Sequence, residues 1–398
     1  MKDECIPGRE LARLIALAGI PLSLLSFGAT ISLALVSLFG VAVFLRDRDF
    51  PEDLKAVFYK LLALYLLILI VELINGGSLF SLAETAFNYL PLIAVAPYAF
   101  ALRKIGLSPD ALDRTIWATL ALGAAISVVI AILSAHPRPG GLDMDALSYG
   151  YVLVVWMLFT FSSALERRRE SIPLLILLVF SLAVLLYAKT KIVIICVIVG
   201  FLVVGIIWAI QSRRWRTLLI GTALSIVPFG LVAYYLMWSR MIEFAHSLTV
   251  FLDRGEVIPD GSFGVRMQQN LAGWRAFLDK PIIGHGLAET RVAIGPYFNS
   301  PNPDFYRYIV HNDYIVHMVA FGAFGLVFLL CYFIVALMLM RGAAGEVHRR
   351  AGVALVATLP VLMVAFVVFN MSPMSGLVAI AMGIVLSTPP KAAGQISA

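Results

Sequence analysis

Charged side chains are scarce in this chain of 398 residues, where Asp, Glu, Lys and Arg together make up only 14%. A soluble domain has about 25% charged and about 45–50% apolar residues. Here 61% of the residues are hydrophobic, and the mean hydropathy is +0.93. The composition excludes an ordinary soluble enzyme, a secreted disulfide scaffold and a disordered protein. A membrane β-barrel is also disfavoured, because the apolar residues form long unbroken runs instead of alternating with polar ones.

Cysteine is rare too, since the chain contains only Cys5, Cys196 and Cys331. Cys196 and Cys331 fall inside apolar runs, so we expect no disulfide. The sequence also lacks a phosphate-binding Walker loop, a dinucleotide-binding glycine fingerprint, a Cys/His zinc pattern and the glycine-flanked serine of many hydrolases. We therefore expect neither a cofactor nor a bound metal.

Apolar runs are what the sequence has in abundance, and a transmembrane helix needs roughly 20 mostly apolar residues. We predict an all-α integral membrane protein with about 12 transmembrane helices and one large outer loop that contains short helices. Residues 1–238 would hold the first nine helices, 239–311 the loop, and 312–398 the last three helices with a cytoplasmic tail. The predicted spans are 11–27, 29–45, 57–75, 85–102, 115–134, 148–165, 172–188, 190–210, 217–238, 312–340, 352–370 and 373–388.

The basic residues set the predicted orientation. The net charge of +6 would by itself suit a nucleic-acid-binding protein, but the bases sit in short clusters between the apolar runs. With the N-terminus in the cytoplasm, 20 of the 30 Lys and Arg residues fall in inner segments, and seven of the other ten fall in the loop 239–311. Positive charge on the cytoplasmic side orients membrane helices. We therefore predict cytoplasmic termini and no nucleic-acid partner.

The long loop is predicted to contain an amphipathic helix that begins near Ser262, a candidate N-cap, and ends before Pro281. Arg266 lies in its first turns, where backbone N–H groups and the helix dipole favour anions. Arg275 follows nine residues later, about half a turn out of phase at 3.6 residues per turn. The two arginines therefore do not face one ligand from a straight helix. We take Arg266 as the anion-binding residue and Arg275 as a further candidate, the alternative for each being a solvated surface charge.

Two lysines stand against the charge pattern, because Lys189 and Lys191 lie between two apolar spans at the predicted outer end. Bases are otherwise scarce in the short outer loops, which favours an anion site there. The alternative is that both side chains extend to lipid headgroups.

His311 lies at the entrance of the tenth predicted span, with Asn312 or Asp313 available as helix cap. A helix N-terminus disfavours the imidazolium, and a neutral imidazole suits a general base. The alternative is a histidine that only caps the helix or meets headgroups. His317 is six residues on and faces elsewhere, and His285 between two glycines is interpreted as a turn residue.

Three acidic residues are weaker candidates. Asp143 and Asp145, two residues apart in an outer loop, look like a pair of metal ligands, although such a short pattern often occurs by chance. Glu72 near the outer end of the third span is a functional candidate by its depth, and capping at the membrane interface explains it nearly as well.

Taken in order, Arg266, Trp274, Pro281–Gly286 (PIIGHG), His311-Asn312 and Gly322–Gly325 (GAFG) form a pattern over about 262–330. This pattern resembles the O-antigen ligase/polymerase family of bacterial envelope glycosyltransferases. Members transfer a glycan from undecaprenyl diphosphate to an acceptor hydroxyl on the periplasmic face. The acceptor is lipid A–core in ligases and another glycan in polymerases.

The resemblance implies a role for each matching residue. His311 matches the family's essential histidine, and Arg266 matches the loop arginine that meets the diphosphate. Lys191 stands where many members carry arginine, and a lysine lacks the bidentate fork of a guanidinium. Lys189, Asn312 and Arg275 are further candidates around the substrate. Leu326 and Val327 replace the Thr-Gly that ligases usually carry after the first glycine.

The resemblance thus implies a metal-independent, inverting membrane glycosyltransferase of the bacterial inner membrane, with its active site facing the periplasm. Its partners would be the undecaprenyl-diphosphate-linked glycan, a lipid A–core or glycan acceptor, and membrane lipids. We favour a ligase and keep a polymerase as the alternative. A transporter or flippase for lipid-linked glycans is a more distant alternative, because the spans carry almost no charge at mid-depth and show no repeat. A non-catalytic member of a polysaccharide export complex is a third.

Overall fold

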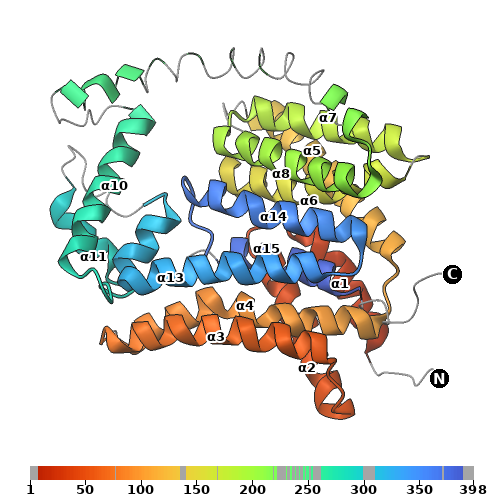
Figure 1. Cartoon of the computed structure of the whole chain (residues 1–398), viewed down its shortest axis with the longest axis horizontal. Coiled ribbons are helices and arrows are strands. Elements are labelled where there is room, and N and C mark those ends of the chain that lie inside the picture. Colours follow the sequence, from red (N-terminus) through yellow and green to blue (C-terminus); the bar gives the residue numbers. More distant parts are fainter. Residues whose placement is uncertain are drawn as a thin grey trace.

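The computed structural model describes residues 8–76, 78–134, 140–167, 169–217, 219–221, 261–298, 310–369 and 372–388, with isolated residues between 222 and 260. Throughout these residues the regular structure is helical, with no strand (Figure 1). The helices are α1 (Arg9–Leu22), α2 (Gly28–Asp47), α3 (Glu52–Ile74), α4 (Leu79–Ile105), α5 (Pro109–Ser134), α6 (Ala146–Glu166), α7 (Ser171–Tyr187), α8 (Lys191–Ser212), α10 (Gly261–Asp279), α11 (Thr290–Ile294), the 3₁₀ helix η1 (Gly295–Tyr297), α13 (Asp313–Gly342), α14 (Glu346–Met363) and α15 (Ser372–Leu386).

Seven helices in the described part of the chain are long and apolar enough to cross a membrane, namely α2, α3, α4, α5, α6, α8 and α13. Two apolar helices, Ser171–Tyr187 and Pro373–Leu386, are shorter. The protein is therefore a multi-pass, all-helical membrane protein, as its composition predicts. The predicted span 217–238 lies almost wholly outside the described residues, and the count of twelve stays a prediction.

Capping residues explain where several helices begin. The Ser78 hydroxyl accepts a hydrogen bond from the Ser81 amide at the start of α4, and the Asp145 carboxylate accepts from the Leu147 and Ser148 amides at the start of α6. These side chains satisfy backbone N–H groups that the first turn of a helix leaves without partners. At the other end of α4, Gly106 adopts a left-handed conformation with φ of 70° and stops the helix.

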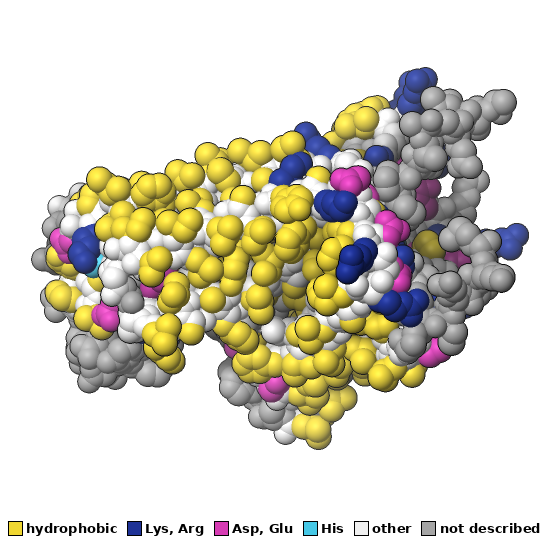
Figure 2. All heavy atoms as spheres, turned by 90° about the horizontal axis from the view of Figure 1, so that it is seen from below, with side chains coloured by type: hydrophobic (Ala, Val, Ile, Leu, Met, Phe, Trp, Pro, Cys, Tyr) yellow, Lys and Arg dark blue, Asp and Glu magenta, His cyan; other side chains and the backbone are white. Residues whose placement is uncertain are grey.

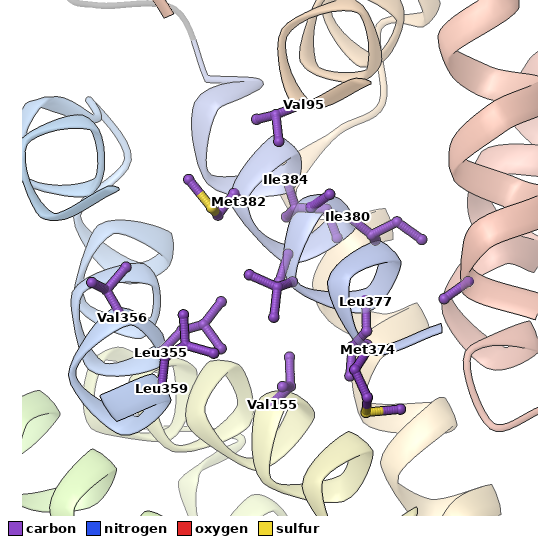
Figure 3. Packing of buried hydrophobic residues seen from close by; sticks show 14 of the residues in the cluster. Val95, Val155, Leu355, Val356, Leu359, Met374, Leu377, Ile380, Met382 and Ile384 are labelled. Atoms are coloured by element: carbon purple, nitrogen blue, oxygen red, sulfur yellow. The ribbon is translucent and has the colours of Figure 1, made fainter. Parts of the chain in front are cut away.

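The core is centred on α15, whose residues from Met374 to Leu386 are all buried. Figure 3 shows side chains of α4, α6 and α14 around this helix, with Val95, Val155 and Leu355 among them. Because α15 is covered by protein on every side, it lies inside the bundle rather than against lipid. Helix α6 is also largely buried. Helices α2, α3, α4, α5, α7, α8 and α13 instead bury one face and expose large apolar side chains on the other, as helices in contact with lipid do.

Ionic contacts gather at one end of the bundle, where α2, α4, α6 and α8 end. There Arg103 pairs with Asp53 at 2.6 Å, and Arg167 pairs with Asp113 at 2.7 Å. Figure 2 shows the same distribution, with hydrophobic side chains over most of the visible face and charged side chains concentrated toward one end. The site residues described below lie at the opposite end, called the site end here.

Two predicted spans differ from the structure. The span 312–340 is not one continuous helix, because Gly322 inside α13 has φ of 62° and ψ of −142°. The span 352–370 is helical only to Met363, and residues 364–369 form turns. Residues 364–369 are apolar, so the hydropathy of the sequence does not indicate that the helix ends at Met363. The amides of Val368 and Phe369 donate instead to the Asp313 carboxylate, at 2.9 and 3.1 Å.

The loop segment Pro281–Gly286 packs directly against the break in α13. The His285 and Gly286 amides donate to the carbonyls of Val319 and Ala320, at 2.9 and 2.8 Å. A Cβ on Gly284 would lie 2.4 Å from the Ala320 oxygen, and one on Gly322 would lie 2.4 Å from the Ile282 carbonyl. Only glycine permits these approaches, which explains the two glycines of the pattern and joins the loop to α13.

Candidate functional site

His311 lies half-buried at the entrance of α13. The next residue, Asn312, is the N-cap, and its Oδ1 accepts from the amides of Tyr314 and Ile315 at 3.1 and 3.3 Å. The Asn312 amide nitrogen donates to Oδ1 of Asn270 at 3.3 Å. The predicted cap is therefore present. It also ties the helix entrance to α10.

Arg266 is half-buried on α10, one turn before Asn270. Residues four apart lie on one face of a helix, so Arg266 is on the face of α10 that meets Asn312. An apolar cluster holds α10, α11 and η1 against α13; it consists of Ala272, Ala276, Ile294, Phe298, Ile315, Met318 and Val319. Gly273 lets the two helices approach closely, because a Cβ there would lie 2.2 Å from Ile315 Cγ2.

The pKa of His311 is lowered from the ordinary histidine value, first by burial and then by the positive charge of Arg266. The negative charge of Asp145 acts against both and raises the pKa. The electrostatic interactions show that Arg266, Asp145 and His311 share one region at the site end. A lowered pKa keeps the imidazole neutral near pH 7, the form that accepts a proton.

Asp145 reaches this region because it begins α6. Its Oδ1 accepts from the Leu147 and Ser148 amides at 2.8 and 3.1 Å, and its Oδ2 accepts from the Ser148 hydroxyl. Asp143 is used differently, since both of its carboxylate oxygens lie 3.1 Å from the Ser26 amide. The two carboxylates thus serve separate contacts. In the described residues no group of three or more His, Cys, Asp and Glu side chains is arranged to hold a metal ion.

Lys191 is the first residue of α8, half-buried, and Lys189 is exposed with a positive φ of 54°. Helix α8 runs antiparallel to α14, with the Cys196 sulfur 3.7 Å from the Thr358 carbonyl. The Tyr314 hydroxyl on α13 donates to the Pro360 carbonyl on α14, at 3.2 Å. The beginning of α8 and the entrance of α13 therefore lie at the same end of the bundle.

Arg275 lies on a different face of α10 from Arg266. It is exposed, and its charge acts on the pKa of Tyr297, whose hydroxyl donates to Asp279 at 2.5 Å. The structure therefore brings Arg266, Asn312, His311 and Asp145 together and places Arg275 toward the other end of α10. Its role in binding stays a prediction.

Glu72 and His285 support the site rather than form it. Glu72 is fully buried and accepts from the Leu287 amide at 3.0 Å and from the Ser81 hydroxyl, so it fixes the end of the docked loop. The His285 Nε2 lies 2.8 Å from the Ala276 carbonyl, which joins the same loop to α10. Sequence reasoning missed Asn270 and the part played by Asp145. The spacing of Asn270 four residues after Arg266 was the available signal for the first.

Comparison with known proteins bears on the same segment. Residues 176–330 match a family model described as O-antigen ligase. The matched region contains His311, Asn312, Arg266, Arg275, Lys189 and Lys191. No curated protein matches the chain. The match confirms the family resemblance seen in the pattern from Arg266 to Gly325.

Proposed function

Since residues 176–330 match a family model described as O-antigen ligase, we propose that the chain is a glycosyltransferase of the bacterial inner membrane. It moves a glycan from undecaprenyl diphosphate to an acceptor hydroxyl on the periplasmic face. His311 is the general base, and Arg266 and Lys191 bind the diphosphate. Lys189, Asn312 and Arg275 contribute to the same substrate region.

The proposed reaction is a single displacement that inverts the anomeric centre. His311 accepts the proton of the acceptor hydroxyl while the acceptor oxygen forms a bond to the anomeric carbon. The bond from that carbon to the diphosphate oxygen breaks, and undecaprenyl diphosphate leaves with the electron pair. Positive charge fixed near the leaving group stabilises the negative charge that develops there. Arg266 and Lys191 supply this charge, so the reaction needs no divalent metal.

One observation supports this proposal above the others. His311 is held at the entrance of α13, and its pKa is lowered by burial and by the positive charge of Arg266, which is close enough to act on it. A neutral base next to a positive charge is the pairing that deprotonation of a hydroxyl and departure of a diphosphate require. A transporter for lipid-linked glycans would not need a base at this position.

We favour lipid A–core as the acceptor, which makes the protein a ligase. The polymerase alternative uses a second lipid-linked glycan in the same site. The two differ in product, because a deletion strain of a ligase accumulates full-length lipid-linked glycan, whereas a deletion strain of a polymerase accumulates single repeat units.

Replacing His311 tests the proposal. His311→Gln keeps a polar side chain of similar size but removes the base, and loss of general-base help lowers rates typically by about 10²–10⁴-fold. We expect a loss of this size in transfer by purified protein in nanodiscs, with binding of the lipid-linked donor retained. His246→Gln is the matched control, since His246 is exposed. Activity of His311→Gln within a few-fold of the parent would leave His311 as a helix-entrance residue only.

A further inference from the structure

A fully buried carboxylate lies directly behind the proposed site. Asp313 is the first residue of α13 and is 0% exposed. Its Oδ2 accepts from the amides of Val368 and Phe369, at 2.9 and 3.1 Å. The carboxylate thereby ties the first turn of α13 to the turns that follow α14. Two backbone donors and the N-terminal end of the helix dipole compensate for its burial.

A histidine one turn further along α13 contacts Asp313. The Nδ1 of His317 lies 2.8 Å from the Asp313 carbonyl, its hydrogen-bond partner, and 3.1 Å from the Asp313 Oδ1, which has no hydrogen-bond partner among the described residues. Because a carbonyl only accepts, Nδ1 carries the proton and donates. In the neutral ring Nε2 then accepts from the Tyr89 hydroxyl on α4, at 2.8 Å. Asp313, His317 and Tyr89 therefore form one hydrogen-bonded chain from α13 to α4.

Aromatic rings enclose this chain and separate it from any substrate. His317 is 0% exposed and is stacked on Phe328 with centroids 5.6 Å apart. Phe321 and Phe369 lie at 6.0 and 5.8 Å from its ring. An aromatic core would fill the same space without polar atoms, and buried polar groups are costly unless every one has a partner. The network is therefore better explained by what it holds in place than by packing alone.

What it holds is the backbone that carries the proposed base. His311 and Asn312 directly precede Asp313, and α10 contacts this point through the Asn270 side chain and the apolar cluster. We propose that Asp313, His317 and Tyr89 are positioning residues, which hold the entrance of α13 against α4 and the 368–369 turn so that His311 meets the acceptor hydroxyl. This inference rests on the proposed function of His311. A displacement of about 1 Å can cost about 10²-fold in rate, so such a device affects turnover.

The mildest test removes one hydroxyl. Tyr89→Phe keeps the ring and its contacts but leaves His317 Nε2 without its donor. The matched control is Tyr332→Phe, because Tyr332 is as buried as Tyr89 in the same aromatic group and, among the described residues, its hydroxyl contacts the Met382 sulfur alone, at 3.6 Å. We expect kcat to fall by about 3- to 10-fold in Tyr89→Phe, with KM changed by less than about twofold, and to stay within about twofold in Tyr332→Phe.

A second measurement does not depend on transfer. Spin labels at Leu278→Cys on α10 and Val364→Cys after α14, both exposed, report the distance across the site end. Asp313→Asn places an amide donor against the Nδ1–H of His317, and we expect a broader distance distribution than in the parent. The labels are introduced with the native cysteines replaced. Broadening without any glycan transfer in the parent would leave the positioning role intact and overturn only the reaction.

The inference would be overturned by either of two results. One is an equal change of kcat in Tyr89→Phe and Tyr332→Phe, which would make the hydroxyl of Tyr89 part of core packing only. The other is an unchanged distance distribution in Asp313→Asn, which would show that the carboxylate does not hold the entrance of α13.

Discussion

At the scale of single residues, charges of opposite sign act on the pKa of the proposed base. Arg266 on α10 lowers the pKa of His311, and Asp145 at the start of α6 raises it. Burial adds to the effect of Arg266 and is the largest cause. The neutral imidazole is therefore favoured, while a carboxylate remains nearby to stabilise the imidazolium that forms when the acceptor proton arrives.

Asp145→Asn should move the pH dependence of transfer. Transfer needs neutral His311, so the rate rises with pH through the pKa of His311. Removing the carboxylate removes the influence that raises this pKa, and the acid limb of the profile should move to lower pH. Asparagine caps a helix about as well as aspartate, so α6 should remain intact. Initial rates across a pH series measure the limb.

The matched control for this prediction is Asp143→Asn, because in the parent the Asp143 carboxylate contacts the Ser26 amide instead. Its profile should coincide with that of the parent. Arg266→Gln should move the limb in the opposite direction, to higher pH, whatever its effect on donor binding. If the acid limb of the pH–rate profile of Asp145→Asn lies at the same pH as that of the parent, the electrostatic role of Asp145 is contradicted.

Lys191 carries a second residue-scale prediction. Lys191→Ala should lower the transfer rate by about tenfold or more, which is on the order of 1.4 kcal/mol. Lys191→Arg should stay within about twofold, because it keeps the charge and restores the residue common in the resembling family. Initial rates in nanodiscs with EDTA present measure both variants, and chelation alone should leave the parent rate unchanged. The exposed Lys280→Ala is the control; a silent Lys191→Ala would exclude this lysine from the diphosphate site.

The sequence predicts part of the geometry at the site end and does not predict another part. His311 at a helix entrance with Asn312 as cap, and Arg266 early in a loop helix, were readable because caps and helical spacing are local patterns. Asp145 was only a weak candidate in the sequence, as one of two acids two residues apart, because that spacing does not show that Asp145 caps α6 while Asp143 contacts Ser26. Its proximity to His311 depends on helices 166 positions apart in the chain.

At the scale of elements, α13 is a broken helix whose break is filled by a loop. Gly322 interrupts the helical backbone, and Pro281–Gly286 lies against the gap. The side chain of Asn75, the C-cap of α3, donates to the carbonyls of Ile283 and Ala320, at 2.8 and 3.3 Å. Three segments distant in sequence therefore meet at the base of the site.

Gly322→Ala should dislodge this junction. Alanine disfavours a φ of 62°, and its Cβ would lie 2.4 Å from the Ile282 carbonyl carbon; a residue forced into such a conformation costs on the order of 1–3 kcal/mol. We expect a lower thermal unfolding midpoint in detergent and a transfer rate reduced by about tenfold or more. Gly342→Ala on the same helix has no atom within 4 Å of the new Cβ and should behave as the parent. Equal midpoints in both variants would contradict a tight junction.

Helices α2, α6, α7, α8 and α15 lie within two residues of the predicted spans at each end, whereas α3, α4, α5 and α14 begin five or six residues before theirs. Two helix ends that the apolar runs misplace share a cause. The sequence predicts residues 364–369 as the end of a span because they are apolar, yet the amides of Val368 and Phe369 donate to Asp313 of another helix. Helix α1 stops at Leu22 instead of 27, where the chain turns sharply into α2. Partners from distant parts of the chain decide such ends, and local hydrophobicity does not record them.

At the scale of the whole molecule, the two ends of the bundle differ in chemistry. The end opposite the site is tied together by ion pairs such as Arg103 with Asp53 and Arg350 with Glu166. The site end is tied together by helix caps and by side chains that bond backbone groups, as Glu72 and Asn75 do. The end opposite the site is therefore the one that the pattern of Lys and Arg residues assigns to the cytoplasm.

The orientation can be tested by cysteine labelling in intact cells and in opened cells. With the native cysteines replaced, Leu278→Cys at the site end should react with a membrane-impermeant maleimide added from outside. Gly342→Cys at the opposite end should react only after the inner membrane is opened. Both positions are exposed, so accessibility within the protein is matched. Outside labelling at position 342 would reverse the proposed topology and place the site in the cytoplasm.

The broken helix also has a consequence for synthesis at the ribosome. A carbonyl left without a donor inside lipid is costly, so the interruption at Gly322 needs partners before α13 can settle in the membrane. The groups that bond the carbonyls of Val319 and Ala320 come from Asn75, His285 and Gly286. All three are translated before α13. The hydrogen-bond donors for the Val319 and Ala320 carbonyls are therefore synthesised before α13. When α13 enters the membrane, these donors are already present to pair with its interrupted backbone.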